Sequence, residues 1–524
     1  MNSIITPDFL LLSTLFLTTL NLLAPFISKS DSRSRNSLLI IISCFFFINI
    51  LIIDWLFLKG VRVQLSVNVI GNFSLGFHLE PLSLIFLTLI STLWICALIY
   101  TIQYLKINII GNSSHFLFFL NLSVLAGIMI ALSSNLFTMF TFYEILTLST
   151  APLIGHSGGD KIISGMSKYL KILVIAGAIL FLPAVMVIYT RVGHGNFISH
   201  GFLANYFSPA QAMILFFMFI FGIAKAALLP MHQWLPAAMV AHYPVSALLH
   251  AVIVVKSGLF CIYKILLYVF GLKYLHTIFS DLNIAIWIPA FTILYSSFKA
   301  LQSNNIKKIL AYSTINQLGI ALLSAFMFTS KSMGAAILHL CSHSFTKICL
   351  FYAMGCIYSL KKTAQASDLL GVAAEMPKTS FIIVLASLSL IGIPPFGGFI
   401  SKFYIMLAAV QQDQLLVITI LALSTLFSAL YLTKLISFIY KPVDDIVNSG
   451  EFGARSDGVT PIYNRQALSN NVTKFSSIDY NLPSLSREHS LPTPIFISLI
   501  ICTSGVILFY FVQIFIKKFL IYIA

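Results

Sequence analysis

The chain has 524 residues, of which 59% are hydrophobic and only 9% are charged. A soluble domain carries about 25% charged residues, so this composition excludes a water-soluble globular protein. Basic residues outnumber acidic ones by 31 to 16, a net charge of +15. In a soluble protein that excess would favour a nucleic-acid partner, but in a membrane protein basic loops on the cytoplasmic side explain it, and no nucleic-acid partner is expected.

The apolar residues come in runs of about 20, which is the length that a helix needs to cross a bilayer. Outer-membrane strands would alternate in pieces of about 10 residues, and no such series is present. The sequence therefore predicts an all-α polytopic membrane protein with about fourteen transmembrane helices. The expected spans are 8–28, 37–58, 79–103, 115–133, 135–155, 163–190, 208–241, 244–270, 282–297, 306–328, 333–360, 380–411, 413–440 and 493–518.

Residues 61–78 alternate between apolar and polar around Gly71-Asn72, a pattern that predicts a β-hairpin outside the bilayer. Residues 441–492 are polar and predict a long cytoplasmic loop. The predicted organisation is an N-terminal part at 1–110 with three helices and the hairpin, five-helix units at 115–270 and 282–440, the loop at 441–492, and a C-terminal helix at 493–518.

Two of the predicted spans are too long and contain prolines: Pro230 lies in the seventh, and Pro394 and Pro395 in the twelfth. Proline removes a backbone donor and clashes with the preceding turn, so both spans should be broken helices. Inside a membrane a broken helix is tolerated only where protein or a wet cavity satisfies the freed backbone. Because the breaks lie five spans apart, spans 4–8 and 9–13 are predicted to be two repeats of inverted orientation.

Basic residues in the loops predict the orientation. Loops on the side of the N-terminus hold eight, Lys264 counted among them, and the opposite loops hold nineteen, Lys307 among them. The positive-inside rule therefore predicts that both termini lie outside the cytoplasm, in a multi-pass protein of the cell inner membrane.

Four lysines lie well inside predicted spans, and Glu144 is the one acid expected at comparable depth. The lysines are Lys225, Lys256, Lys347 and Lys402. An ionised group at the bilayer centre costs at least about 2.5 kcal/mol, so such residues usually face a polar interior and have a function. Structural ion pairs are the alternative, but one glutamate cannot neutralise four lysines. A proton pathway is therefore the favoured interpretation.

Two histidines extend this polar set on one helix. His339, His343 and Lys347 recur at intervals of four and form one stripe. Imidazole donates at one nitrogen and accepts at the other, which suits a proton relay. Zinc is the alternative ligand of such histidines, but no carboxylate or cysteine on that face completes a site, so no metal is expected.

His250 and Lys256 are six residues apart in the eighth predicted span, which places them about 120° apart around a regular helix. Such residues cannot share one narrow face. They serve either two cavities or one wide cavity.

Several motifs in this order resemble the proton-translocating antiporter family. That family comprises the antiporter-like subunits of respiratory complex I and the A-type and D-type subunits of Mrp sodium/proton antiporters. The matching motifs are Tyr143-Glu144, Ala224-Lys225-Ala226 with Pro230 to Pro236, Pro244-Val-Ser246 with His250, Lys307-Lys308 to Gln317, His339 to Lys347, and Gly392 to Lys402.

The resemblance implies roles for individual residues. Glu144 is similar to the family's essential glutamate and Lys225 to its lysine partner on broken helix seven. His250 and Lys256 resemble central groups between half-channels, with His343 and Lys347 continuing the line. Lys402 occupies the place of the terminal lysine or glutamate. The length and the stretch from Phe142 to Thr150 are most similar to the D-type proteins of Mrp antiporters.

The leading functional hypothesis is therefore a proton-translocating subunit of a cation/proton antiporter, working with other membrane subunits, with sodium as the candidate counter-ion. The alternative is the antiporter-like subunit of a redox-driven complex, either complex I or a membrane-bound hydrogenase. A third possibility is a scaffold subunit that has lost transport. The chain has no Rossmann fingerprint, Fe–S cysteine pattern or P-loop, so no cofactor is expected and any NADH:quinone chemistry would belong to partners.

The hypothesis makes one geometric prediction. The Glu144 carboxylate should lie about 4–7 Å from the Lys225 ammonium, in contact directly or through one water.

Overall fold

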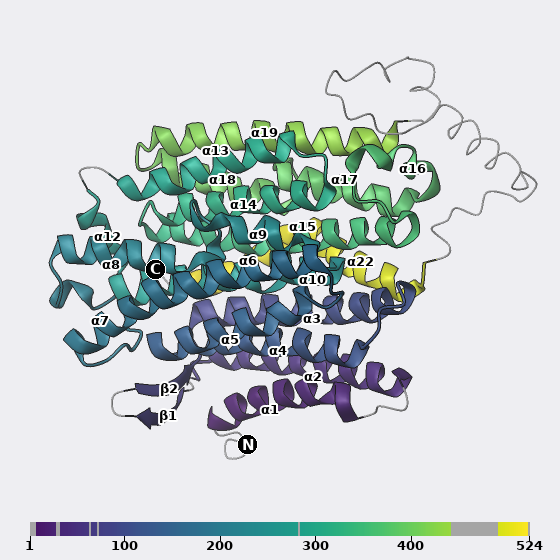
Figure 1. Cartoon of the computed structure of the whole chain (residues 1–524). Coiled ribbons are helices and arrows are strands. Elements are labelled where there is room, and N and C mark those ends of the chain that lie inside the picture. Colours follow the sequence, from purple (N-terminus) through teal and green to yellow (C-terminus); the bar gives the residue numbers. More distant parts are fainter. Residues whose placement is uncertain are drawn as a thin grey trace, which may run out of the picture.

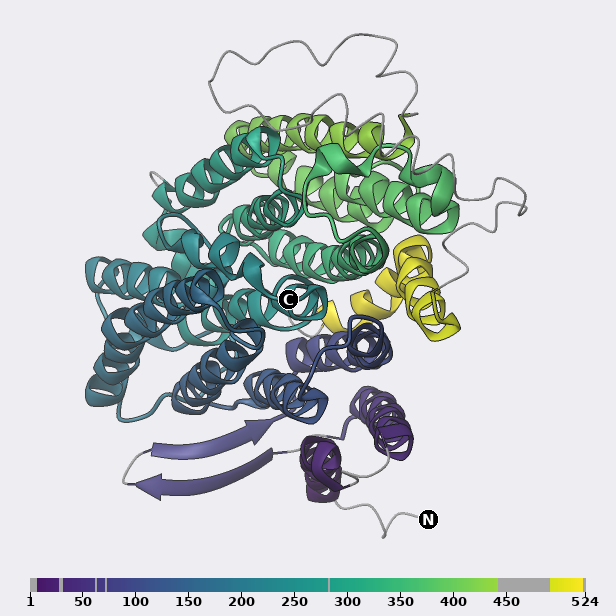
Figure 2. The same cartoon turned by 45° about the vertical axis from the view of Figure 1, so that its right-hand side comes forward.

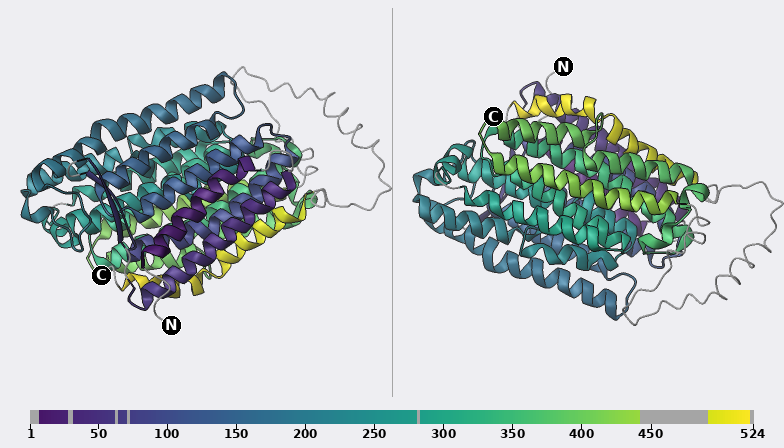
Figure 3. Two further views of the ribbon diagram at one scale, coloured as in Figure 1. Left: turned by 90° about the horizontal axis from the view of Figure 1, so that it is seen from below. Right: turned by 90° about the horizontal axis from the view of Figure 1, so that it is seen from above.

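The computed structural model describes residues 7–27, 32–61, 64–70, 73–280, 283–441 and 491–521. Most of these residues form helices that run roughly side by side along one direction (Figures 1 and 3). The polar loop predicted at 441–492 lies outside the described residues except at its two ends.

The N-terminal part holds three helices and one hairpin. The elements are α1 (Pro7–Ile27), α2 (Ser32–Leu58), β1 (Gln64–Ile70), β2 (Phe73–His78) and α3 (Pro81–Ile107). The two strands pair antiparallel, with Gln64 opposite His78, and extend to one side of the helices (Figure 2). Pro81 begins α3, where its missing N–H has no intrahelical acceptor to lose.

The next part of the chain contains the first interrupted helix. Its elements are α4 (Ser113–Leu132), α5 (Leu136–Ile154), α6 (Asp160–Ala176), the π turn η1 (Gly177–Phe181), α7 (Leu182–Val192), η2 (Leu203–Asn205), α8 (Pro209–Gly222), η3 (Ala224–Ala226), η4 (Met231–Gln233), α9 (Trp234–Ala237), η5 (Ala238–Val240), α10 (Tyr243–Ala247), the π turn η6 (Leu248–Val252), α11 (Val254–Ile265) and the π turn η7 (Leu266–Phe270).

The remaining part contains the second interrupted helix. Its elements are α12 (Leu272–Ile278), η8 (Ile284–Ile286), α13 (Trp287–Gln302), α14 (Ile306–Ala325), α15 (Ser330–Lys361), η9 (Ala366–Leu369), α16 (Val372–Glu375), α17 (Pro377–Ile391), α18 (Gly397–Val410), α19 (Leu415–Tyr440), α22 (Thr493–Ile507) and α23 (Phe509–Leu520).

Both interruptions lie beside the prolines of the sequence. Helix α8 ends at Gly222, well before Pro230, and short 3-10 turns carry the chain onward through a left-handed Ala227. Helix α17 ends at Ile391, the prolines follow, and α18 begins at Gly397. Proline disfavours helical backbone in the residue before it, which explains why α17 does not continue into Pro394. Pro230 lies too far from Gly222 for this effect to end α8.

Nine helices of the described chain are long and apolar enough to cross a membrane, or ten if the bent pair α22 and α23 is one span. Four shorter apolar helices accompany them: Leu10–Phe26, α8, α17 and α18. The chain is therefore a mostly helical polytopic membrane protein. The count of fourteen spans and the inverted relation of the two five-helix units stay predictions.

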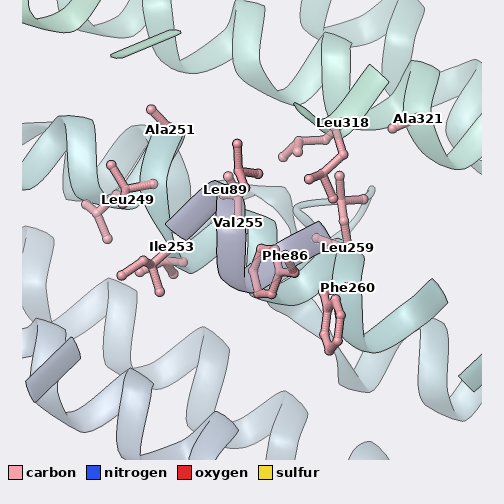
Figure 4. Close-up of a cluster of buried hydrophobic side chains, with 14 of the residues drawn as sticks. Phe86, Leu89, Leu249, Ala251, Ile253, Val255, Leu259, Phe260, Leu318 and Ala321 are labelled. Carbon is pink, nitrogen blue, oxygen red and sulfur yellow. The ribbon is translucent and has the colours of Figure 1, made fainter. Parts of the chain in front are cut away.

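Two segments form the centre of the molecule. The most apolar 18 residues of Tyr243–Phe270 are all buried inside the molecule, and so are those of α15. In α2 only a third of the corresponding stretch is buried. Side chains of α11 such as Val255, Leu259 and Phe260 gather with Phe86 of α3 and Leu318 of α14 (Figure 4). The polar side chains in the middle of these two segments are therefore shielded from lipid, which matters for the charges described next.

Candidate functional site

Lys225 lies at the first interruption and is completely buried. Its ammonium donates to the Tyr143 backbone oxygen at 2.8 Å and to the Thr147 hydroxyl at 2.5 Å. It also lies 3.1 Å from the centre of the Tyr143 ring, which gives a cation–π contact. Tyr143 and Thr147 are four residues apart on α5 and so occupy one face, which is how this helix supplies all three contacts.

Glu144 does not form a direct ion pair with Lys225: within the described residues the three ion pairs are His78–Glu80, Lys264–Glu80 and Lys361–Glu375. The two groups are nevertheless close enough to interact electrostatically, and Thr147 is a neighbour of both. One carboxylate oxygen is buried without a hydrogen-bond partner and points at Gly177, where a Cβ would overlap it. The absence of a side chain at Gly177 leaves room for the carboxylate.

Because of a π turn, His250 and Lys256 both contact helix α15. His250 lies in η6 and stacks on Phe351 of α15, with ring centres 4.8 Å apart. Lys256 lies on α11 and contacts Nδ1 of His343, also on α15. The wider π turn and the non-helical Ile253 between them rotate the chain, so the 120° separation expected for a regular helix does not apply. Of the two alternatives, the geometry fits one wide site.

The stripe on α15 continues the series. The rings of His339 and His343 are nearly parallel, 6.3 Å apart. Nδ1 of His339 is 2.9 Å from the Ser401 hydroxyl, which belongs to α18. Lys347 donates to the Leu310 backbone oxygen at 3.1 Å and contacts the Ser313 hydroxyl, both on α14. The stripe therefore links α11, α14 and α18.

Lys402 lies directly after Ser401 at the second interruption and is almost fully buried. Its ammonium donates to the backbone oxygens of Leu390 and Ile391, at 3.2 and 2.8 Å, and to the Thr425 hydroxyl at 3.3 Å. The last carbonyls of a helix lack intrahelical donors and carry partial negative charge, so the end of α17 stabilises this cation.

In the structure, most of the predicted groups therefore lie next to one another in a continuous series. The Lys256–His343 contact connects the two halves of the chain, and His343–His339–Ser401 leads on to Lys402. Among the described residues no hydrogen bond joins Lys225 to Lys256. Gly258 instead lets the η3 backbone pack on α11, since a Cβ there would lie 2.6 Å from the Ala226 nitrogen. We call the set from Glu144 to Lys402 the buried row; its members are Glu144, Lys225, His250, Lys256, His339, His343, Lys347 and Lys402.

Several polar atoms along the buried row are buried without a hydrogen-bond partner in the described chain. They are Oε1 of Glu144, Nδ1 of His250, Oγ of Ser257, Nε2 of Gln317, and Nε2 of His339 and His343. Buried polar groups are nearly always hydrogen-bonded, and those without a protein partner are usually satisfied by internal water. The row is therefore suited to hold water.

Three buried charges differ from what the sequence predicted. Lys264, expected in a loop, is completely buried on α11 and pairs with Glu80 at 3.2 Å. Glu144 is accordingly not the one deep acid: Glu80 and Asp54 are both buried, and Thr88 donates to Asp54 at 2.7 Å. The signal was available for Lys264, which lies inside the predicted span 244–270. Glu80 lies at the edge of the predicted span 79–103, where a side chain can still reach the interface, so only the approach of a distant helix shows that it is buried.

Lys307, also expected in a loop, is half-buried at the start of α14. Its ammonium donates to the Ala241 backbone oxygen at 2.5 Å and lies over the Tyr243 ring, 4.5 Å from its centre. It therefore ties α14 to the loop before α10.

The sequence and the fold are similar to those of known proteins. The family model described as "NADH:quinone oxidoreductase/Mrp antiporter, TM" matches residues 133–428, more than half of the chain. The putative antiporter subunit mnhA2 of Staphylococcus aureus strain MSSA476 is 29% identical over 390 residues, which are 70% of this chain and 47% of that protein. The same subunit from strain JH9 is 28% identical over the same coverage. The chain spans about half the length of these curated relatives.

Two solved structures share the fold. A chain of the Mrp complex from Dietzia sp. DQ12-45-1b superposes with a TM-score of 0.78 at 20% identity, covering 98% of this chain and 97% of that one. A chain of the membrane-bound sulfane sulfur reductase, an archaeal respiratory membrane complex, superposes with a TM-score of 0.71 at 19% identity, covering 98% and 99%.

Proposed function

This chain belongs to the NADH:quinone oxidoreductase/Mrp antiporter transmembrane family, and on that premise we propose that it is a proton-translocating membrane subunit of a multisubunit cation/proton antiporter. The observation that carries the proposal is the contact between Lys256 and His343. It connects a titratable group of the first half to a stripe of titratable groups in the second, and so makes the buried row continuous across the centre.

In this function protons pass between neighbouring groups of the row. Lysine and histidine each hold a proton in one state and lack it in the other, and a charge on one group disfavours the charged form of the next. Protonation of His343, for example, acts on Lys256, Lys347, His339 and His250, which all lie within electrostatic range of it. Water at the unpaired polar atoms would complete the path where side chains do not touch.

Glu144 and Lys225 act as the gate at one end. A charged carboxylate favours the ammonium form of Lys225, and separation or protonation of Glu144 releases that hold. Thr147 supports this role because it contacts the ammonium and neighbours the carboxylate. Since the two charges do not touch directly, a small shift of α5 or of the π turn at Gly177 changes their interaction.

The test measures proton flux in membrane vesicles that contain the assembled complex. Lys256→Met keeps the apolar stem but removes the ammonium next to His343, and flux should fall tenfold or more, equivalent to about 1.4 kcal/mol or more. Lys361→Met is the matched control, since Lys361 is paired with Glu375 at the end of α15, away from the row. Assembled Lys256→Met with undiminished flux would contradict the proposal.

We also propose the finer features that the sequence favours: fourteen spans, with spans 4–8 and 9–13 as inverted repeats at 115–270 and 282–440, both termini and the hairpin outside the cytoplasm, and an inner-membrane location. The two interruptions, placed in corresponding members of the units, support the repeats. Within the complex we propose a D-type position, sodium as the exchanged ion, and other membrane subunits as partners.

A redox-driven complex is the second candidate, because the family's description includes NADH:quinone oxidoreductase and a chain of a respiratory membrane complex shares the fold. Purification through a tag on this chain separates the two candidates. Co-purifying small membrane subunits with sodium-dependent proton flux support the antiporter. Co-purifying flavin or Fe–S subunits with quinone or hydrogenase activity support the redox-driven pump.

A further inference from the structure

A second group of buried charges lies at the end of α11 that faces the hairpin, and the buried row does not use it. The Lys264 ammonium and the Glu80 carboxylate are 3.2 Å apart, with the lysine fully buried and the glutamate side chain 7% exposed. Glu80 directly precedes α3, immediately after β2. Charges held this deep need a reason, because desolvation makes them costly.

The pair is connected to the surface. Nδ1 of His78, the last residue of β2, is 3.7 Å from the second oxygen of Glu80, and the His78 side chain is one-third exposed. Tyr268 also lies within electrostatic range of Glu80. Glu80 therefore stands between a solvent-accessible imidazole and a fully buried ammonium.

The pair is also connected to the buried row. Ser257, Cys261 and Lys264 are spaced at four and three residues on α11 and so share one face of the helix. We call these three residues the α11 stripe, to distinguish them from the stripe on α15. The α11 stripe begins next to Lys256 and covers about 10 Å along the helix axis. The Ser257 hydroxyl is buried and lacks a partner among the described residues, and Cys261 lies within electrostatic range of both Lys225 and Lys264.

We propose that the α11 stripe is a proton passage between the buried row and the hairpin end of the molecule. Lys264 and Glu80 are its proton carriers, and His78 is the group that exchanges protons with solvent. The inference rests on the proposed function. The Lys264 ammonium first gives a proton to the Glu80 carboxylate, and Glu80 passes it to the His78 imidazole or to solvent. The neutral Lys264 then takes a proton from the ammonium of Lys225 or Lys256 along water at Ser257 and Cys261, which restores the ion pair. Each step breaks one N–H or O–H bond and forms another.

The competing explanation is a purely structural ion pair that holds the hairpin. Lys264 also contacts the Ser133 backbone oxygen, and Thr138 accepts a hydrogen bond from the Gly76 backbone N–H at 2.9 Å. The pair thus sits where the hairpin, the α4–α5 turn and α11 meet. The two explanations differ in what happens when both charges are removed together.

The decisive variant is Glu80→Gln combined with Lys264→Met in the full chain within its complex. Replacing a buried pair by neutral residues of similar size often leaves stability unchanged, whereas removing one partner strands a charge. As a passage, the assembled double variant should lose proton flux at least tenfold. Wild-type flux in the assembled double variant overturns the proposal. Lys361→Met with Glu375→Gln, a paired charge at the opposite end of α15, is the matched control and should keep its flux.

A second measurement does not depend on the double variant. In a chain whose cysteines other than Cys261 are changed to alanine, methyl methanethiosulfonate should modify Cys261 at least tenfold faster than Cys96 in a chain that retains only Cys96. Both thiols are buried, but only Cys261 lies on the stripe. Equal modification rates would show that water does not reach the α11 stripe, and they would overturn the proposed passage.

The failure of this inference can be told apart from failure of the proposed function. Lys225→Ala should abolish flux under the proposed function, whichever route protons take. If Lys225→Ala abolishes flux while the double variant transports normally, the passage is wrong and the function stands. If Lys225→Ala itself transports normally, the proposed function is wrong.

Discussion

At the first broken helix Lys225 lies within the interruption, in η3, and its ammonium reaches across to α5, where it contacts Tyr143 and Thr147 near the Glu144 carboxylate. At the second broken helix Lys402 follows the interruption and turns back to the last carbonyls of α17. Both ammonium groups are buried beside interrupted backbone. One is stabilised by a neighbouring helix with an acid nearby, and the other by the end of its own broken span.

This difference separates a site that can switch from a site that holds its charge. A carboxylate loses its charge on protonation, whereas a backbone carbonyl keeps its partial charge throughout. The electrostatic stabilisation of the Lys225 ammonium can therefore change during turnover, whereas that of Lys402 stays constant. We infer that the first break is the more sensitive to mutation, and the following predictions rank the two sites.

The largest effect should come from Lys225→Ala. The variant removes the ammonium that lies beside the Glu144 carboxylate, so proton flux should fall about 100-fold, equivalent to about 2.8 kcal/mol. The complex should still assemble, because the alanine introduces no buried charge. Vesicle flux measured with a pH-sensitive dye, beside quantification of the complex, checks both parts. Assembled Lys225→Ala with wild-type flux contradicts the prediction.

Glu144→Gln should lower flux tenfold or more, since it keeps the size of the side chain but removes its charge, at about 1.4 kcal/mol per tenfold. Glu144→Asp keeps a carboxylate one methylene shorter and should retain part of the activity. Flux assayed in the three proteins side by side tests the order Glu above Asp above Gln. Normal transport by Glu144→Gln would show that Lys225 needs another partner.

Gly177→Ala should disturb the same gate without any change of charge. The new Cβ would overlap the Glu144 carboxylate, so the carboxylate must move relative to Lys225, and flux should fall about fivefold to tenfold. The control is Gly111→Ala, which should keep normal flux, because its new Cβ would have no neighbour within 4 Å and Gly111 does not have a positive φ. Gly158 is unsuitable as a control because its φ is positive. Equal flux in Gly177→Ala and Gly111→Ala would show that this packing does not matter.

Lys402→Gln should have a smaller effect, about fivefold. The amide can still donate to the carbonyls at the end of α17, so the interrupted backbone keeps a partner while the charge is lost. The comparison with Lys225→Ala in the same flux assay measures the difference between the two breaks. A loss at Lys402 as large as that at Lys225 would mean that the two breaks do not differ in this way.

The smallest effects should come from the two threonines that contact the lysines. Thr147→Val removes the acceptor at 2.5 Å from Lys225 and should lower flux about threefold. Thr425→Val removes the longer contact, 3.3 Å from Lys402, and should change flux less than about twofold. Because the substitutions are identical, the ratio of the two fluxes reports directly on the sites. A reversed order would contradict the ranking.

Much of this molecule follows from the sequence alone. Low charge and runs of about 20 apolar residues require helices in a membrane, because only such segments satisfy their own backbone there. The prolines at 230, 394 and 395 mark the interruptions, since proline cannot continue a helix hydrogen-bond pattern. Lys225, Lys256, Lys347 and Lys402 could be selected because a charge inside an apolar run has no cheap explanation.

The tertiary structure decided which of these groups meet. A helical period identifies the face on which a residue lies but not the helix that it will face, and a π turn changes even the face, as at His250 and Lys256. The Lys264–Glu80 pair depends on the approach of α11 to the start of α3, and the place of Glu144 depends on the missing side chain at Gly177. Such contacts arise from the packing of distant segments, whose approach no local pattern encodes.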